Sequence, residues 1–152
     1  MCGIFSLLNY SHYDINYIKT QFLKGQQRGP EDTKSTTFDS NVFFGFHRLA
    51  INGLNVGANQ PIDLHNIAVI CNGEIYNWKY LYEVAEVEPG TKSDCEVIIH
   101  LYKKYGIDYT LKMLDGVFAL VLFDIEKGVL YAARDLYGVR PMFVGEGDIS
   151  KG

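Results

Sequence analysis

The chain begins Met1-Cys2-Gly3-Ile4-Phe5-Ser6-Leu7-Leu8, which places a cysteine directly before a short apolar run. Residues 3–8 have the length and composition of a buried β-strand. Removal of Met1 leaves Cys2 as the N-terminal residue, with both a thiol and a free α-amine. An α-amine has a pKa of roughly 7.7–8, so part of it is neutral near pH 7 and can act as a base toward the thiol. This stretch therefore predicts a strand that begins at an N-terminal nucleophile, a cysteine version of the N-terminal threonine arrangement.

The composition is that of one globular domain. The chain has 152 residues, of which 47% are hydrophobic, and a formal net charge of −4. A negative net charge does not indicate nucleic-acid binding, because nucleic-acid-binding proteins normally carry an excess of basic residues. No apolar run reaches the 18 or so residues of a membrane span, and no secretory signal is visible. We therefore expect a cytoplasmic protein that binds neither nucleic acid nor membrane.

The three cysteines are Cys2, Cys71 and Cys95. Their number and spacing predict neither a disulfide framework nor a metal-binding pair. We expect Cys71 and Cys95 to be small buried residues of the core. Cys2 is then the cysteine available for chemistry.

Helical and strand patterns alternate along the rest of the chain. Asp14 can cap a helix that ends at Arg28-Gly29-Pro30, and Ser93-Asp94-Cys95-Glu96 has the form of a capping box that opens another. The remaining predicted elements are strands over residues 42–46, 67–71, 116–124 and 129–133, a helix over residues 109–114 and a hairpin turn over residues 125–128. Asn72-Gly73 predicts a tight turn that stops the 67–71 strand. This order favours a layered α+β domain over a parallel doubly wound sheet.

Three segments place polar side chains at the ends of these elements: residues 46–52, 71–77 and 93–97. Such positions expose the backbone and allow side chains to converge. Taken singly, each has a structural explanation. Arg48 can be a surface charge, Asn72-Gly73 a simple turn, and Asp94 a carboxylate that favours its helix dipole.

Taken together with Cys2, these segments resemble class II glutamine amidotransferase domains, which are N-terminal-nucleophile hydrolases. Within that class the resemblance is to the glutaminase domain of glutamine-dependent asparagine synthetases. The motifs that carry it occur in family order over nearly the whole chain: Met1-Cys2-Gly3-Ile4, Arg28-Gly29-Pro30, His47-Arg48-Leu49, Cys71-Asn72-Gly73-Glu74-Ile75-Tyr76-Asn77, Ser93-Asp94-Cys95-Glu96-Val97, Leu114-Asp115-Gly116-Val117-Phe118-Ala119 and Ala133-Arg134-Asp135-Leu136-Tyr137-Gly138-Val139-Arg140-Pro141. The resemblance implies one domain over residues 1–152, a four-layer αββα sandwich of two antiparallel sheets between helices, truncated at its C-terminus.

The resemblance also implies a mechanism. Cys2 attacks the side-chain carboxamide of glutamine while its own α-amine shuttles the proton, and water hydrolyses the resulting γ-glutamyl thioester. The Asn72 side-chain amide and the Gly73 backbone N–H stabilise the oxyanion. Cys2, Asn72 and Gly73 are thus the implied catalytic residues.

Glutamine carries two charged groups that its binding site must recognise. By resemblance, Arg48 binds the α-carboxylate, and Asp94 pairs with the α-ammonium with help from Glu74 and Gly73. The implied substrate-binding residues are Arg48, Leu49, Ala50, Ile51, Asn52, Asn72, Gly73, Glu74 and Asp94. We expect no metal and no cofactor in this domain.

Other residues of the motifs have a structural interpretation. We expect His47 to be a packed strand residue, and Tyr76 and Phe118 to belong to the core or the pocket wall. Arg28 and the Arg134-Asp135 pair are expected to be charged residues that support the site residues without contacting the substrate.

The sequence departs from the family in two ways. Gln27 stands where members usually have histidine, at a position without a catalytic role. The chain also ends at Gly152, whereas asparagine synthetases continue into a synthetase domain that binds ATP, with Mg, and aspartate, and receives ammonia through a tunnel. We therefore expect the ammonia to pass to a synthetase domain or partner outside this chain, which is a fragment, a natural short form or one component of a complex.

Two other functions fit parts of the pattern. One is an amidotransferase domain that serves another acceptor, such as a sugar phosphate. The other is a catalytically silent interaction or regulatory domain that keeps the fold. Residues 72–77 and 48–51 favour the asparagine synthetase branch over an amidotransferase for another acceptor, whereas the silent domain stays an open alternative.

Overall fold

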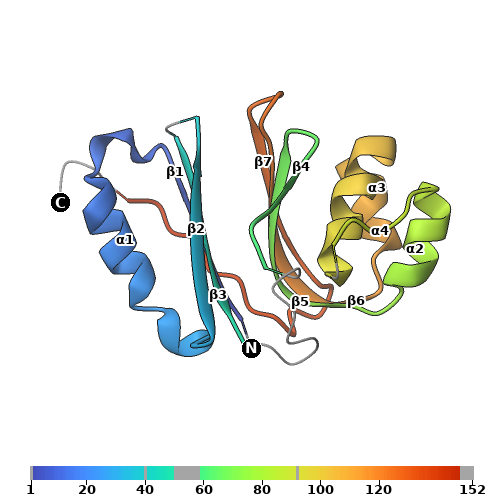
Figure 1. Cartoon of the computed structure of the whole chain (residues 1–152), viewed down its shortest axis with the longest axis horizontal. Helices are drawn as coiled ribbons and strands as arrows, with labels where there is room; N and C mark the ends of the chain where they lie inside the picture. The colour runs from blue at the N-terminus through green and yellow to red at the C-terminus, as the bar shows by residue number, and fades with distance from the viewer. Residues whose placement is uncertain (1, 40, 50–58, 92, 148–152) are drawn as a thin grey trace.

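The computed structural model of the chain describes residues 2–39, 41–49, 59–91 and 93–147. The described residues form four layers (Figure 1): helix α1, a three-stranded sheet, a four-stranded sheet, and helices α2, α3 and α4. The predicted αββα arrangement of two antiparallel sheets between helices is confirmed.

The elements of the first half are β1 (Gly3–Leu8), η1 (Tyr10–His12), α1 (Ile15–Leu23), η2 (Gln26–Arg28), β2 (Asp32–Phe38) and β3 (Val42–Arg48). Those of the second half are β4 (Ile62–Leu64), β5 (Ile67–Ile75), α2 (Trp78–Ala85), η4 (Asp94–Glu96), α3 (Val97–Tyr105), α4 (Ile107–Met113), β6 (Gly116–Asp124) and β7 (Val129–Arg134). The strand order is β1-β3-β2 in one sheet and β4-β5-β6-β7 in the other, and every neighbouring pair is antiparallel.

The two sheets pack face to face through apolar side chains. The buried residues of this layer are Phe38, Val42, Phe44, Ala68, Ile70, Val121 and Phe123, with Ile4 packed against them. Side chains alternate between the two faces of a strand, so the intervening residues face the helices. Because both faces of β3 and β5 are covered, these strands are apolar over most of their length, as the sequence predicted.

Each outer face is covered by helices. On the first sheet, Ile18 and Phe22 of α1 pack on Phe43, and Gly45 leaves room for the Phe22 ring, which a β-carbon there would meet. On the second sheet, α2 and α3 cover a larger core that includes Cys71 and Cys95. Both cysteines are buried with free thiols, as expected. None of the helices in the described part of the chain has the length and hydrophobicity needed to cross a bilayer.

Two predicted ends are wrong. Asp14 does cap α1 and accepts the N–H of Asn16 at 2.6 Å, but the helix ends at Leu23 and Arg28 lies in a separate short turn, η2. The strand predicted to stop at Cys71 runs on to Ile75, because Asn72 and Gly73 pair with Ala119 and Phe118 of β6. Long-range pairing therefore overrides the turn preference of the Asn-Gly dipeptide.

The capping box forms only in part. The Ser93 hydroxyl caps the N–H of Cys95 at 3.3 Å and opens η4 before α3. The Glu96 side chain instead accepts the N–H groups of Gly90 and Thr91, in the loop that precedes the helix. The last predicted helix, over residues 109–114, is α4 and starts two residues earlier, at Ile107.

The predicted β6–β7 hairpin is confirmed, and the buried carboxylate of Asp124 stabilises it. Asp124 is only 4% exposed and accepts the Tyr102 hydroxyl at 2.7 Å, while the Lys127 ammonium lies 2.8 Å away. Burial tends to raise the pKa of Asp124, but its bonds to Lys127 and Tyr102 outweigh burial and hold the pKa below its usual value. The ionised carboxylate is therefore the form that the folded hairpin prefers.

We predict that Asp124→Asn destabilises the protein in a pH-dependent way. The depressed pKa gives stability that is present at neutral pH and lost as the pH falls through the folded-state pKa, below the ordinary 3.8. Urea unfolding at pH 7 is expected to show a loss of about 2 kcal/mol, and the difference from wild type is expected to shrink toward pH 3. Glu126→Gln, in the exposed turn of the same hairpin, is the control. A loss that stays constant with pH would contradict the proposed role of the charge.

Candidate active site

Cys2 immediately precedes β1 and lies against Leu49, the residue that follows β3. Its sulfur accepts the N–H of Leu49 at 3.5 Å and lies 3.6 Å from the Leu49 carbonyl oxygen. The side chain is partly buried. The antiparallel register of Gly3 with His47 brings the start of β1 and the end of β3 together, so Cys2 and Arg48 lie at the same end of the first sheet.

Strand alternation directs three of the predicted site residues to the space between the sheets. Ile4, Phe44 and Ile70 face the layer between the sheets. Residues an even number of positions apart in a strand point to the same face. Cys2 lies two residues before Ile4, Arg48 lies four residues after Phe44, and Asn72 lies two residues after Ile70. Both β1 and β3 contact β5. Figure 1 shows the start of β1 and the end of β5 at the same end of the two sheets. The structure thus brings Cys2, Arg48 and Asn72 to one end of the inter-sheet layer.

Asp94 lies against the last residues of β5. Its carboxylate accepts the N–H of Ile75 at 2.7 Å, which places η4 beside the strand segment that carries Gly73 and Glu74. Asp94 is partly buried and Glu74 is exposed. A carboxylate beside an open strand end can pair with a cationic group that approaches from solvent.

Two residues that sequence reasoning missed connect the two sheets. The Asn59 side chain accepts an Nη1–H of Arg48 at 2.8 Å and donates to Asp32 at 2.5 Å. The next residue, Gln60, is buried and bonds with both its amide oxygen and its amide nitrogen to the Cys71 backbone, at 2.5 and 3.1 Å. Asn59 and Gln60 thus orient Arg48 and hold the strand next to Asn72, although no local sequence pattern marks them.

Gly73 is required by the sheet itself. It pairs with Phe118 of β6, and a β-carbon at residue 73 would collide with the Val117 carbonyl oxygen and the Phe118 backbone. The close approach of β6 is therefore a sufficient reason for glycine at this position.

Asp135 supports this part of the sheet from the end of β7. Its carboxylate accepts four backbone N–H groups at 2.9–3.2 Å, from Phe118, Tyr137, Val139 and Arg140. Burial tends to raise the pKa of Asp135, but the four donors outweigh burial and lower the pKa. Asp135 therefore ties the chain after β7 to the residue that pairs with Gly73.

The other predicted residues fall into three groups. His47 is 2% exposed, stacks on the Phe22 ring at 4.0 Å and bonds to Thr33 and the Phe22 carbonyl, so it is the packed strand residue that was expected. Phe118 is buried. Tyr76 is 57% exposed, which excludes the core but not the pocket wall, the other place expected for it. The backbone N–H of Tyr76 bonds to the Asp115 carbonyl beyond the end of β5. Met1, Ala50, Ile51 and Asn52 lie outside the described residues.

The described residues include no group of three or more His, Cys, Asp or Glu side chains that could hold a metal ion. The polar groups directed to this end of the layer are a thiol, a guanidinium and a carboxamide, and the Asp94 carboxylate lies beside the last residues of β5. Such a set can supply a nucleophile, a hydrogen-bond donor for an oxyanion, and one charge of each sign for a zwitterionic ligand.

The comparisons with known proteins identify the class. The family model described as "Glutamine amidotransferase domain" matches residues 1–151. The chain belongs to the glutamine amidotransferase domain family, which confirms the prediction made from the motifs.

The relatives found are named glutamine-hydrolysing asparagine synthetases. The proteins from Gallus gallus and Homo sapiens are each 42% identical over 148 residues, which is 94% of this chain and 26% of theirs. A probable asparagine synthetase of Acanthamoeba polyphaga mimivirus is 38% identical over 151 residues, which is 95% of this chain and 28% of its own. The chain therefore spans about a quarter of the length of the relatives that it matches.

We predict that Gly73→Ala destabilises the fold by about 1–3 kcal/mol, because the added methyl group forces β5 away from β6. Urea unfolding followed by circular dichroism measures this change. Gly145→Ala is the matched control, since nothing lies within 4 Å of a β-carbon there. Equal stability of the two variants would contradict the packing explanation for Gly73.

Proposed function

We propose that this chain hydrolyses L-glutamine to glutamate and ammonia through a γ-glutamyl thioester on Cys2. The observation that carries the proposal is the convergence of Cys2, Arg48 and Asn72 at one end of the inter-sheet layer, in a chain whose whole length belongs to the glutamine amidotransferase domain family. Removal of Met1 is part of the proposal, because the α-amine of Cys2 serves as the base. The reaction needs no cofactor, since the thiol and the amine supply the nucleophile and the proton transfer.

In the proposed mechanism the Cys2 thiolate attacks the carboxamide carbon of glutamine, and the thiol proton passes to the α-amine. The tetrahedral intermediate places its negative charge on the former carbonyl oxygen. The Asn72 amide and the Gly73 N–H donate to this oxygen, and the loss of one such donor typically costs 10²- to 10³-fold in rate. Collapse of the intermediate transfers the proton to the departing ammonia, and water then releases glutamate by the same steps.

Recognition of free glutamine is assigned to two opposite charges. Arg48 binds the α-carboxylate, and its orientation by Asn59 supports this role, because a fixed guanidinium plane favours two-point binding of a carboxylate. Asp94 pairs with the α-ammonium beside Glu74 and Gly73, and its bond to Ile75 supports a fixed position. Leu49, Ala50, Ile51 and Asn52 complete the proposed pocket.

The ammonia is proposed to serve ATP-dependent asparagine synthesis from aspartate. The names of the relatives support this acceptor. ATP, Mg and aspartate then belong to a synthetase domain or partner and not to residues 1–152. We also propose a cytoplasmic location, where free glutamine is available and thiols stay reduced.

We predict that protein without Met1 releases glutamate from L-glutamine and that Cys2→Ala reduces release to background, because the nucleophile is lost. Intact mass verifies the processing of each sample. The matched control keeps Met1 in front of Cys2, so that the thiol is present but the terminal amine is not; this form is expected to be inactive too. Full activity with Met1 retained would contradict the α-amine as base, and activity in Cys2→Ala would contradict the nucleophile.

We predict that Arg48→Gln and Asp94→Asn raise the KM for glutamine and change kcat little. Each removes a charge-assisted hydrogen bond worth about 1.5–3 kcal/mol, which corresponds to roughly a 10- to 150-fold effect. Steady-state kinetics checks this, with Lys19→Gln on the exposed side of α1 and Asp108→Asn at the start of α4 as charge-matched controls. A fall in kcat at unchanged KM for Asp94→Asn would instead assign Asp94 to the chemistry.

A further inference from the structure

Glu96 is a buried acidic residue that the proposed mechanism does not use. It is 0% exposed, and within the described residues its one ion-pair partner is His100, at 3.1 Å. A buried carboxylate is costly unless donors surround it. Two backbone donors do so: the N–H groups of Gly90, at 2.8 Å, and of Thr91, in a short hydrogen bond.

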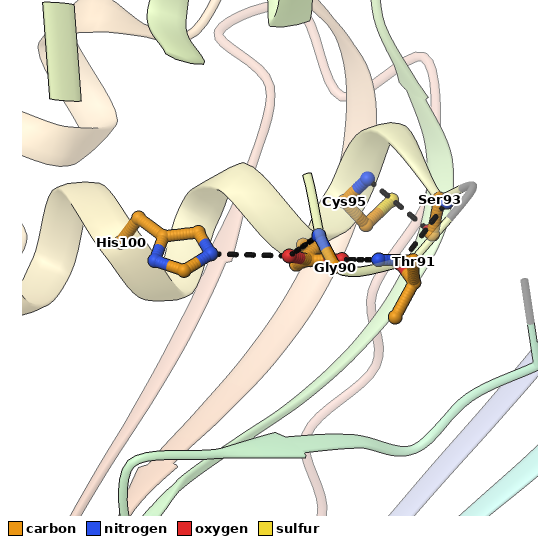
Figure 2. Close-up of polar contacts among 6 residues, drawn as sticks. Gly90, Thr91, Ser93, Cys95 and His100 are labelled. Atoms are coloured by element: carbon orange, nitrogen blue, oxygen red, sulfur yellow. Dashed lines mark hydrogen bonds and ion pairs between the residues drawn. The ribbon is translucent and has the colours of Figure 1, made fainter. Parts of the chain in front are cut away.

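These bonds hold the loop that leads into η4. Figure 2 shows Gly90, Thr91 and Ser93 gathered on one side of this contact and His100 on the other. The Thr91 hydroxyl accepts the N–H of Ser93 at 3.2 Å, and the Ser93 hydroxyl accepts the N–H of Cys95 at 3.3 Å. A continuous series of hydrogen bonds thus runs from Glu96 through Thr91 and Ser93 to the turn that contains Asp94.

Asp94 lies in the middle of this turn. On its far side it accepts the N–H of Ile75, at 2.7 Å. Its position is therefore set by two anchors, the strand end of β5 on one side and the Glu96-centred loop on the other. Burial tends to raise the pKa of Glu96, but bonds from Thr91, Gly90 and His100 outweigh burial and lower the pKa, so this anchor is an ionised acceptor of both backbone donors.

We infer that Glu96 is a positioning residue for glutamine recognition: by holding Gly90 and Thr91, and Ser93 through Thr91, it fixes the Asp94 carboxylate where the α-ammonium of the substrate binds. This inference rests on the proposed function, in which Asp94 recognises that ammonium. This role differs from that of a residue that only stabilises the start of a helix, because loss of Glu96 is expected to weaken recognition of one group of the substrate, the α-ammonium.

The test compares two substrates. L-Glutamine carries the α-ammonium, whereas glutaramate has the same carboxamide and carboxylate without the amine. Glu96→Gln keeps the size of the side chain but replaces one of the two oxygens, each of which accepts one backbone N–H, with an NH₂ donor. We expect the KM for glutamine to rise roughly 10- to 100-fold at nearly unchanged kcat, while kcat/KM for glutaramate stays at the wild-type value. Glu83→Gln, on the exposed side of α2, is the matched control.

A second pair of variants tests the same series if Glu96→Gln does not fold. Thr91→Val removes the hydroxyl that accepts the Ser93 N–H, and Thr91→Ser keeps it. We expect Thr91→Val to raise the KM for glutamine but not for glutaramate, and Thr91→Ser to behave as wild type.

The outcomes separate the inference from the proposed function. Equal losses on both substrates, or no loss on either, would overturn the positioning role of Glu96. If Asp94→Asn raises the KM for glutamine and neither Glu96→Gln nor Thr91→Val does, the inference alone fails. If Asp94→Asn leaves the KM for glutamine unchanged, the proposed role of Asp94 fails first, and the inference fails with it.

Discussion

The packing of the two sheets against each other is the contact on which the rest of the structure depends. Ile4 and Phe44 from the first sheet and Ala68 and Ile70 from the second fill this layer. Because strand side chains alternate, burying these residues between the sheets also fixes the direction of the residues two or four positions along. Cys2, Arg48 and Asn72 therefore lie at the end of the same layer, although they are far apart in the sequence. A shift of one residue in the register of β1 or β5 would turn the polar groups away from one another.

Polar contacts outside the apolar layer hold the site residues in place. Asn59 orients Arg48, Gln60 bonds to both backbone groups of Cys71, and Asp94 accepts the N–H of Ile75. In each case a side chain from a loop or turn bonds to a residue of a strand. A substrate with one charge of each sign requires this kind of rigidity, because both charges must be met at once while the carboxamide stays next to the thiol.

Much of the fold was predictable from local pattern. The apolar runs predicted β1, β3 and the β6–β7 hairpin, and Asp14 predicted the start of α1. The motifs predicted the family, which the comparisons confirm. The errors occurred where contacts between residues far apart in the sequence determine the local structure. Asn72-Gly73 has the composition of a turn, but pairing with β6 keeps it in a strand, and the same pairing explains why residue 73 is glycine. Glu96 matched a capping box, but its carboxylate bonds to the preceding loop. Asn59 and Gln60 carry no local signal, since their partners are 11 or more residues away.

The central claim is that Cys2 is the nucleophile of a glutamine-hydrolysing site, and alkylation by an α-chloroketone analogue of L-glutamine tests it most directly. Peptide mapping after labelling locates the modified residue, while glutamate release is followed in the same samples. If Cys2 is the nucleophile, we expect one label per chain on the peptide that begins at Cys2, labelling that is slowed by glutamine, and loss of hydrolysis in step with labelling. A label on Cys71 or Cys95, or hydrolysis that persists in fully labelled protein, would contradict it.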